Sequence, residues 1–387
     1  MKPLSLRGIT WNHSRAFPPL VATAQRFEEQ NQNVQIRWER RSLHEFGHAD
    51  LSSLSQSFDL LVIDHPMLGD VEQAGTLLDL HPMLPSDALN ELTKDATGPS
   101  LASYWFHDRL YALPIDAAAP AASCRPDILN AAHLQEPETW AEVIEIARLG
   151  YVQMPGFPVD LFMNFMGLCL SYGSSVAADR DQLLDRSIAL QCLDQLRELA
   201  SLMPDSIYEY NPISLYETMA GCNTVAYCPF AYTYSNYSRR GFAPNRLRFS
   251  APVKFGANHA MRTVLGGTGI GISSKCDIPD VALSYCLFVA GAECQTTLYG
   301  LAGGQPASLT AWNDPTLNLV SNNFFERTLS SIQTAYVRPR YSGYIRLQEQ
   351  GGLPIIKYLR RNISATDALD TVDALYRASL KGSTHGA

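Results

Sequence analysis

One short segment of the chain has the residue types and spacing of a zinc-hydrolase site. His44, Glu45 and His48 match the pattern H-E-x-x-H, in which a helix presents two imidazole ligands one turn apart and the carboxylate acts as general base. Gly47 weakens a helix at this position, and Arg41 places a charge where such a helix needs apolar residues. A solvated loop or a short surface helix is therefore the favoured interpretation, and a zinc metallohydrolase that uses the HEFGH segment stays as an alternative.

Polar and aromatic side chains follow three expected strands. The opening strand ends at Trp11, an apolar run ends at Ile63, and a third strand ends near Asp116. In open α/β sheets, ligands bind beyond the carboxyl ends of the strands, where loops converge. A helix cap with one core aromatic residue would explain the first group equally well, and Asp116 fits a hinge role as well as a ligand role. The candidate ligand contacts in this part of the chain are Trp11, Asn12, His13, Arg15, Asp64, His65 and Asp116.

An aromatic cluster follows a strand that we expect at 224–227. The rings of Phe230, Tyr232 and Tyr234 can stack on the apolar faces of sugars or on planar ligands, and phenol hydroxyls supply orienting hydrogen bonds. A packing surface between two lobes is the alternative interpretation. Near the end of the chain, Arg340 could clamp a carboxylate or a phosphate, although a surface ion pair is the more common role of such a residue. These four residues complete the candidates drawn from side-chain chemistry.

The order of strands and helices predicts an α/β protein with two lobes. The first sixty residues alternate strand, helix, strand, helix and strand, with a helix after Pro18–Pro19 and a half-exposed strand over 34–38. A nearly continuous apolar run over 58–64 is typical of a central parallel strand. The middle of the chain is expected to be largely helical, and strand character returns at 247–253 and 263–273. The chain is therefore expected to cross between the lobes more than once.

The composition limits the class of protein. Of 387 residues, 46% are apolar and 18% are charged, which excludes a disordered or fibrous chain. The formal net charge of −8 argues against a nucleic-acid partner or an anionic membrane surface, because both require basic patches. Beyond the HEFGH segment no motif predicts a metal or a cofactor, since the glycines of 266–271 lead into a strand whereas a dinucleotide loop opens a helix.

The cysteines indicate no disulfide scaffold. Eight cysteines in a chain of this length are too few for one. Cys169 and Cys192 stand in apolar helical contexts, where a reduced cysteine behaves as a small apolar residue. Cys222 and Cys228 are close enough in the sequence to be bridged, and the sequence leaves open whether they are.

Five segments have patterns that occur together in one protein family. They are Phe27–Asn31 (FEEQN), Leu110–Asp116 (LYALPID), Pro137–Trp140 (PETW), Gly266–Gly269 (GGTG) and Gly303–Ala307 (GGQPA). In this order and spacing they resemble the extracellular solute-binding proteins of ABC importers, in the large group that includes many carbohydrate binders. The last two segments add Gly267 and Gln305 to the candidate ligand contacts.

The resemblance implies a periplasmic-binding-protein-like fold, in which two α/β lobes joined by a multi-crossing hinge close on a ligand in the cleft between them. We expect residues 1–116 with about 255–305 in the N-terminal lobe, and about 117–254 with 306–387 in the C-terminal lobe. The chain departs from the family in the segment Met219–Phe230, which lacks the expected sugar-stacking tryptophan. It also begins directly with a strand and shows no signal peptide.

The function implied is capture of a small polar solute, a carbohydrate or a related polyhydroxylated compound, for the membrane permease subunits of an ABC transporter. No catalysis, metal or cofactor is expected, and the protein is expected to be bacterial, monomeric and periplasmic. The carboxylates of Asp64 and Asp116 favour a neutral ligand, because they accept hydrogen bonds from hydroxyl groups. An anionic ligand would instead need fixed positive charge, which Arg15, His13, His65 and Arg340 could provide. A cytoplasmic ligand-sensing protein on the same fold is a further alternative.

Overall fold

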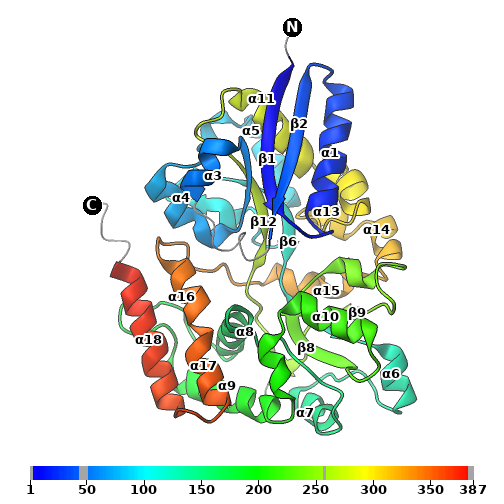
Figure 1. Ribbon diagram of the computed structural model, residues 1–387, viewed down its shortest axis with the longest axis vertical. Coiled ribbons are helices and arrows are strands. Elements are labelled where there is room, and N and C mark those ends of the chain that lie inside the picture. The colour runs from blue at the N-terminus through cyan, green and yellow to red at the C-terminus, as the bar shows by residue number, and fades with distance from the viewer. Residues whose placement is uncertain (1–2, 43–50, 256–258, 382–387) are drawn as a thin grey trace. The chain divides into compact units, whose positions relative to one another are not determined.

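The computed structural model describes residues 3–42, 51–255 and 259–381 (Figure 1). The HEFGH segment at 44–48 lies outside these residues. Within them, no single helix is long and apolar enough to cross a membrane, and one pair with a bend of 52°, Pro279–Ala290 with Ala292–Tyr299, meets that test by length and composition alone.

The chain divides into two compact units. The first consists of Met1–Ala118 and Gly266–Glu326, and the second of Ala119–Leu265 and Arg327–Ala387. The chain thus changes unit three times, after residues 118, 265 and 326. The sequence-based divisions lie near 116, 255 and 305, so the largest difference concerns the third crossing.

A five-stranded sheet forms the centre of the first unit. Its strands are β1 (Leu4–Trp11), β2 (Val34–Arg41), β3 (Leu60–Ile63), β6 (Leu113–Ala118) and β12 (Gly266–Ile272), and β4 (Trp105–Phe106) pairs with β5 (Arg109–Leu110) in a separate hairpin. The order is β2-β1-β3-β12-β6. β1 is parallel to β2 and β3, whereas β12 is antiparallel to both β3 and β6. The carboxyl ends of β1, β3 and β6 and the amino end of β12 therefore share one edge of the sheet.

Among the helices of the first unit, α1 (Phe17–Gln30) and α11 (Pro279–Ala290) pack on this sheet. The others are α3 (Leu51–Ser57), α4 (Leu68–Ala74), α5 (Ser86–Asp95), α12 (Ala292–Cys294), α13 (Leu309–Trp312) and α14 (Pro315–Val320), and α15 (Phe324–Gln333) spans the third change of unit. Prolines begin α1, where the first helical turn needs no donor, and α1 lies beside β2 in Figure 1. In β2, Val34, Ile36 and Trp38 are buried and alternate with exposed residues, which confirms the half-exposed strand.

One hydroxyl group joins three elements in the core of the first unit. The hydroxyl oxygen of Tyr285 on α11 accepts a hydrogen bond from the indole N–H of Trp38 at 3.0 Å. It also lies 2.9 Å from the Thr23 hydroxyl and 3.3 Å from the carbonyl oxygen of Leu20, both on α1. Gly8 on β1 leaves room for the Trp38 ring, since a Cβ atom there would lie 2.6 Å from it. The hydrogen bonds fix α1 and α11 against the same sheet.

A three-stranded antiparallel sheet belongs to the second unit. It has the order β8-β7-β9, with β7 (Pro120–Cys124), β8 (Tyr227–Tyr232) and β9 (Arg248–Ser250), and β10 (Lys254–Phe255) pairs with β11 (His259–Ala260). The sequence predicts this strand at 224–227, ahead of the aromatic cluster. The predicted start lies three residues before the observed start of β8. The N–H groups of Ala226 and Tyr227 bond instead to the carbonyl oxygen of Tyr151, and the ladder with β7 begins only at Tyr227.

Helices make up the rest of the second unit. They are α6 (Pro126–Ala131), α7 (Trp140–Arg148), α8 (Pro158–Ser171), α9 (Arg186–Ala200), α10 (Pro212–Gly221), α16 (Tyr344–Gln350), α17 (Gly352–Leu359) and α18 (Ala365–Lys381). All residues of α8 from Leu161 to Leu170 are buried. This helix contacts α9, α16 and α17, which explains why it is apolar on all sides.

Replacing Tyr285 with phenylalanine tests the core of the first unit. Tyr285→Phe removes the acceptor of the Trp38 indole and the partner of Thr23, and leaves both polar groups buried. We expect the free energy of unfolding to fall by about 1–3 kcal/mol. Urea denaturation measures the change, with Ser284→Ala at the adjacent exposed position as the control. Equal stability of the two variants would contradict the role of the hydroxyl.

Candidate functional site

The shared strand edge of the first unit collects most of the candidates from the sequence. Trp11 ends β1, Asp64 follows β3, and Asp116 lies in the last half of β6, opposite Thr268 of β12. We call the following residues the strand-edge cluster: Trp11, Asn12, His13, Arg15, Asp64, His65, Asp116, Gly267 and Gln305. Their common location follows from the parallel course of β1, β3 and β6, as the sequence predicts.

A buried ion pair joins two members of this cluster. The Nε–H of Arg15 donates to Oδ2 of Asp116 at 2.7 Å, and Nη2 donates to Oδ1 of the same carboxylate. The side chains are only 5% and 3% exposed. Burial raises the pKa of Asp116, and the adjacent guanidinium group opposes that effect. Both residues, which the sequence presents as ligand contacts, thus have one another as bidentate partners.

Trp11 and His13 form a stacked pair beside Arg15. Their ring centroids are 5.2 Å apart with an angle of 15° between the planes. Nδ1 of His13 accepts the backbone N–H of Arg15 at 2.9 Å, which assigns the remaining proton of the neutral ring to Nε2. Burial, with a smaller contribution from the charge of Arg15, lowers the pKa of His13 to about 4. Neutral His13 therefore offers one N–H donor and no positive charge at pH 7.

Trp11 itself is 4% exposed and Asn12 is exposed. The tryptophan carries His13 on its ring, and the guanidinium carbon of Arg15 lies 5.8 Å from its centroid. These contacts make Trp11 the platform that orients His13. A direct contact of Trp11 with a ligand stays a prediction.

Asp64 and His65 begin a short helical turn after β3, η1 (His65–Met67). The Asp64 side chain is 22% exposed, whereas His65 is 1% exposed, and Nδ1 of His65 lies 3.2 Å from the Asp64 carboxylate. Tyr104, which the sequence analysis missed, donates its hydroxyl proton to the carbonyl oxygen of Ile63 at 3.3 Å and lies edge-on to His65. Asp64 is thus the partly exposed carboxylate of the strand-edge cluster.

Gly267 and Gln305 shape the backbone at the end of β6. Gly267 has a φ of +107°, and a Cβ atom there would lie 2.3 Å from the carbonyl oxygen of Asp116, so only glycine fits. The buried side-chain amide of Gln305 donates to the carbonyl oxygen of Ala117 at 2.8 Å, and the backbone carbonyl oxygen of Gln305 accepts the Ala117 N–H at 3.1 Å. Both residues hold the strand that carries Asp116.

The remaining candidates lie in the second unit. Phe230 is fully buried and stacks on Trp140 in the core, since β8 extends to residue 232 and includes it. Tyr232 pairs with Pro120 at the start of β7, and Tyr234 lies edge-on to Tyr216 at 6.3 Å. The two tyrosines, with Arg340, are called the tyrosine cluster below.

The segment that precedes Arg340 is hydrogen-bonded to Leu265, the last residue before the second change of unit. The carbonyl oxygen of Tyr336 accepts the N–H of Leu265, and Nε of Arg338 donates to the carbonyl oxygen of Leu265 at 3.0 Å. Burial lowers the pKa of Arg340. Leu265 precedes the second change of unit and Pro120 follows the first. Within its own unit, the strand-edge cluster therefore lies next to residues at which the chain passes from one unit to the other. The same holds for the tyrosine cluster within the second unit.

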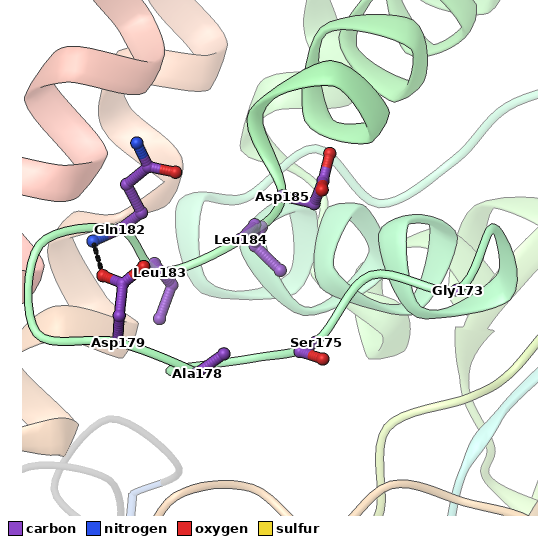
Figure 2. A pocket seen from close by; sticks show the side chains of 8 residues that line it. All are labelled: Gly173, Ser175, Ala178, Asp179, Gln182, Leu183, Leu184 and Asp185. Carbon is purple, nitrogen blue, oxygen red and sulfur yellow. Dashed lines mark hydrogen bonds between the residues drawn. The ribbon is translucent and has the colours of Figure 1, made fainter.

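Two further observations limit the chemistry of the described residues. Among residues 3–42, 51–255 and 259–381, no three His, Cys, Asp or Glu side chains gather as a metal site requires. A hollow of about 240 Å³ in the second unit is lined by the loop 173–185 (Figure 2) and by none of the candidates.

The buried ion pair yields a prediction about stability. Asp116→Asn leaves the charge of Arg15 buried without a counter-ion, so we expect the free energy of unfolding to fall by about 3–5 kcal/mol. The double variant Arg15→Met, Asp116→Asn should lose less than the sum of the two single changes. The exposed pair Arg7–Glu39 is the control, and Glu39→Gln should cost less than about 1 kcal/mol. Urea denaturation of the four variants measures these values, and additive single changes would contradict the coupling.

His13 yields a prediction about pH. Its pKa falls from 6.5 in the unfolded chain to about 4 in the folded protein, so the unfolded chain binds more protons between these values. The free energy of unfolding should therefore be lost as the pH falls from 6.5 towards 4, by about 1–3 kcal/mol from this residue. His13→Gln should remove that part of the pH dependence in a urea titration series. An unchanged slope would contradict the assignment.

Comparisons with known proteins agree with this architecture. A family model described as bacterial extracellular solute-binding protein matches residues 10–295. No curated protein matches the sequence significantly. The maltose-bound MalE3 structure from T. maritima superposes with a TM-score of 0.82, at 16% identity over 97% of this chain and 99% of that one.

Two other solved structures are equally similar. A solute-binding protein from Agrobacterium radiobacter in complex with ribitol has a TM-score of 0.81 and 18% identity, over 97% of this chain and all 100% of that one. One from Thermotoga lettingae bound with alpha-D-tagatose has a TM-score of 0.83 and 15% identity, over the same shares of 97% and 100%. These structures confirm the periplasmic-binding-protein-like fold, and because the family model covers most of the sequence, this chain belongs to the bacterial extracellular solute-binding protein family.

Proposed function

We propose that this protein binds a neutral, polyhydroxylated small molecule, a sugar or a sugar alcohol, and delivers it to the membrane subunits of an ABC importer. Its family consists of solute-binding proteins, which are not enzymes and act outside the cytoplasm. Structural relatives are described as bound to maltose, ribitol and tagatose. The periplasm is the proposed location and the monomer the proposed functional form.

The observation that supports a neutral ligand is the charge state of the strand-edge cluster. Arg15 is the cation that would attract an anion, and its guanidinium group forms a bidentate ion pair with Asp116. His13 is neutral because its pKa is about 4. An anionic ligand would have to compete with a buried carboxylate for Arg15 and would face Asp64 nearby. A hydroxyl-rich ligand meets no such repulsion.

The same residues match the hydrogen-bonding needs of a sugar. The carboxylate of Asp64 can accept hydrogen bonds from hydroxyl groups, and the Nε2–H of His13 can donate one. The rings of His13, Tyr232 and Tyr234 can pack on the apolar faces of a sugar ring. We propose that the strand-edge cluster and the tyrosine cluster both take part in binding. Phe230 is proposed to act from the core, through the packing of β8.

A ligand screen tests the proposal. Purified protein is heated with maltose, ribitol and tagatose, with other neutral sugars, and with sugar phosphates and organic acids. A ligand at 100 times its dissociation constant should add about 2.7 kcal/mol to the free energy of unfolding. The best neutral ligand should bind almost equally at low and high salt, since no ion pair is screened. If only anionic compounds stabilise the protein, and this stabilisation is lost at high salt, the proposal of a neutral ligand is wrong.

Two aspartates at opposite ends of β3 provide a matched pair of variants. Asp64→Asn removes the partly exposed carboxylate at the strand-edge cluster, so we expect the dissociation constant for the neutral ligand to rise at least about tenfold. Asp59 precedes β3, and its Oδ2 accepts the N–H of Arg7 at 2.8 Å, so Asp59→Asn should leave binding unchanged. Calorimetric titration measures both. Tighter binding by Asp64→Asn would indicate an anionic ligand, and equal loss in both variants would indicate a general structural effect.

A further inference from the structure

Two cysteines meet in the core of the second unit. Cys169 lies on α8 and Cys192 on α9, and both are 0% exposed in one apolar core. Burial raises the pKa of Cys169, and the neighbouring Cys192 thiol adds to that effect. One turn further along each helix, the amide nitrogen of Gln195 donates to the hydroxyl of Tyr172 at 2.7 Å. Since α8 also packs on α9, these observations bring the turns that carry the two cysteines together.

We infer that Cys169 and Cys192 form a disulfide when the protein folds in an oxidising compartment. All eight cysteines are free thiols in the structure. The inference rests on the location outside the cytoplasm that family membership implies, where disulfides form and persist.

The oxidation balances with a low-molecular-weight or protein disulfide as the oxidant. One thiolate attacks a sulfur of the oxidant and forms a mixed disulfide, and a first thiolate leaves. The second cysteine then attacks the sulfur of its partner in the mixed disulfide and displaces the second thiolate of the oxidant. The chain gives up two protons and two electrons, the S–S bond forms, and the oxidant is reduced to two thiols.

The positions of three other thiols in the second unit do not favour a bond among them. Cys124 pairs with Tyr227 in the β7–β8 ladder and Cys228 pairs with Ser123, so the two cysteine side chains point to opposite faces of the sheet. Cys222, which the sequence places near Cys228, caps α10, and its sulfur lies 3.2 Å from the hydroxyl of Thr224.

Burial decides when the bond can form. In the folded protein neither sulfur is exposed, so no oxidant can reach them. Burial also raises the pKa of Cys169, which keeps it a thiol rather than a reactive thiolate. Oxidation must therefore take place while the chain folds, before α8 and α9 pack together. A molecule that has folded under reducing conditions keeps both thiols.

The bond would close a loop of 24 residues, from Cys169 to Cys192. This loop includes the connection 173–185, whose hollow is drawn in Figure 2. In the reduced form the connection is held by hydrogen bonds, among them the N–H of Asp185 to the hydroxyl of Ser174 at 2.9 Å. A covalent link beneath it would stabilise α8, α9 and the loop together by restricting the unfolded chain.

The test refolds the full chain in oxidised and reduced glutathione, and in parallel in a strong reductant. Free thiols are then alkylated in denaturant and the unreduced peptides are analysed by mass spectrometry. We expect the reduced sample to give all eight thiols and the oxidised sample six, with one linked peptide pair that joins residues 169 and 192. The Tm of the oxidised form should be higher by on the order of 5–10 °C.

Variants separate the pair from the other cysteines. Cys222→Ser should keep the linked peptide and the shift in Tm, whereas Cys169→Ser and Cys192→Ser should each lose both. Eight free thiols in the oxidised wild type, or a different linked pair, would overturn the inference even if a variant fails to fold. No sugar enters the experiment, so a failure of the proposed ligand and a failure of the disulfide are recognised separately.

Discussion

The ion pair between Arg15 and Asp116 is the constraint on which the strand edge depends. Arg15 lies in the loop after β1, and Asp116 belongs to β6, with β3 and β12 between these strands in the sheet. The pair therefore ties together two strands that do not touch. Two buried charges are costly to desolvate, and only a bidentate geometry offsets that cost. Gly267 and Gln305 fix the backbone of β6 that makes this geometry possible.

The same pair sets the electrostatics of the edge. A guanidinium group so close to His13 adds to the effect of burial and keeps the imidazole neutral. With Arg15 matched by Asp116, the polar groups that remain are hydrogen-bond donors and acceptors, with Asp64 as the partly exposed carboxylate. The charge of Arg15, which looks free in the sequence, is thus matched inside the fold by Asp116.

The sequence predicts the strand edge well because its evidence is local. The apolar run before Asp64 and the turn after Trp11 identify carboxyl ends, and parallel strands bring such ends together. The pairing of Arg15 with Asp116 spans 101 positions along the chain, and no local pattern specifies it. The start of β8 is misplaced because Ala226 and Tyr227 bond first to Tyr151, a partner from a distant segment. Phe230, expected after the strand, consequently lies inside it and faces the core.

The position of β12 in the sheet bears on the order in which the protein is made. This strand lies between β3 and β6, yet a ribosome synthesises it only after the 147 residues from Ala119 to Leu265. Until then the nascent chain has two unpaired strand edges, at β3 and at β6, and the second unit still lacks Arg327–Ala387. Neither unit can form all of its contacts during most of translation. Long-range strand pairings of this kind also form slowly. The nascent chain therefore completes neither unit until β12 and the last segment of the second unit have been made.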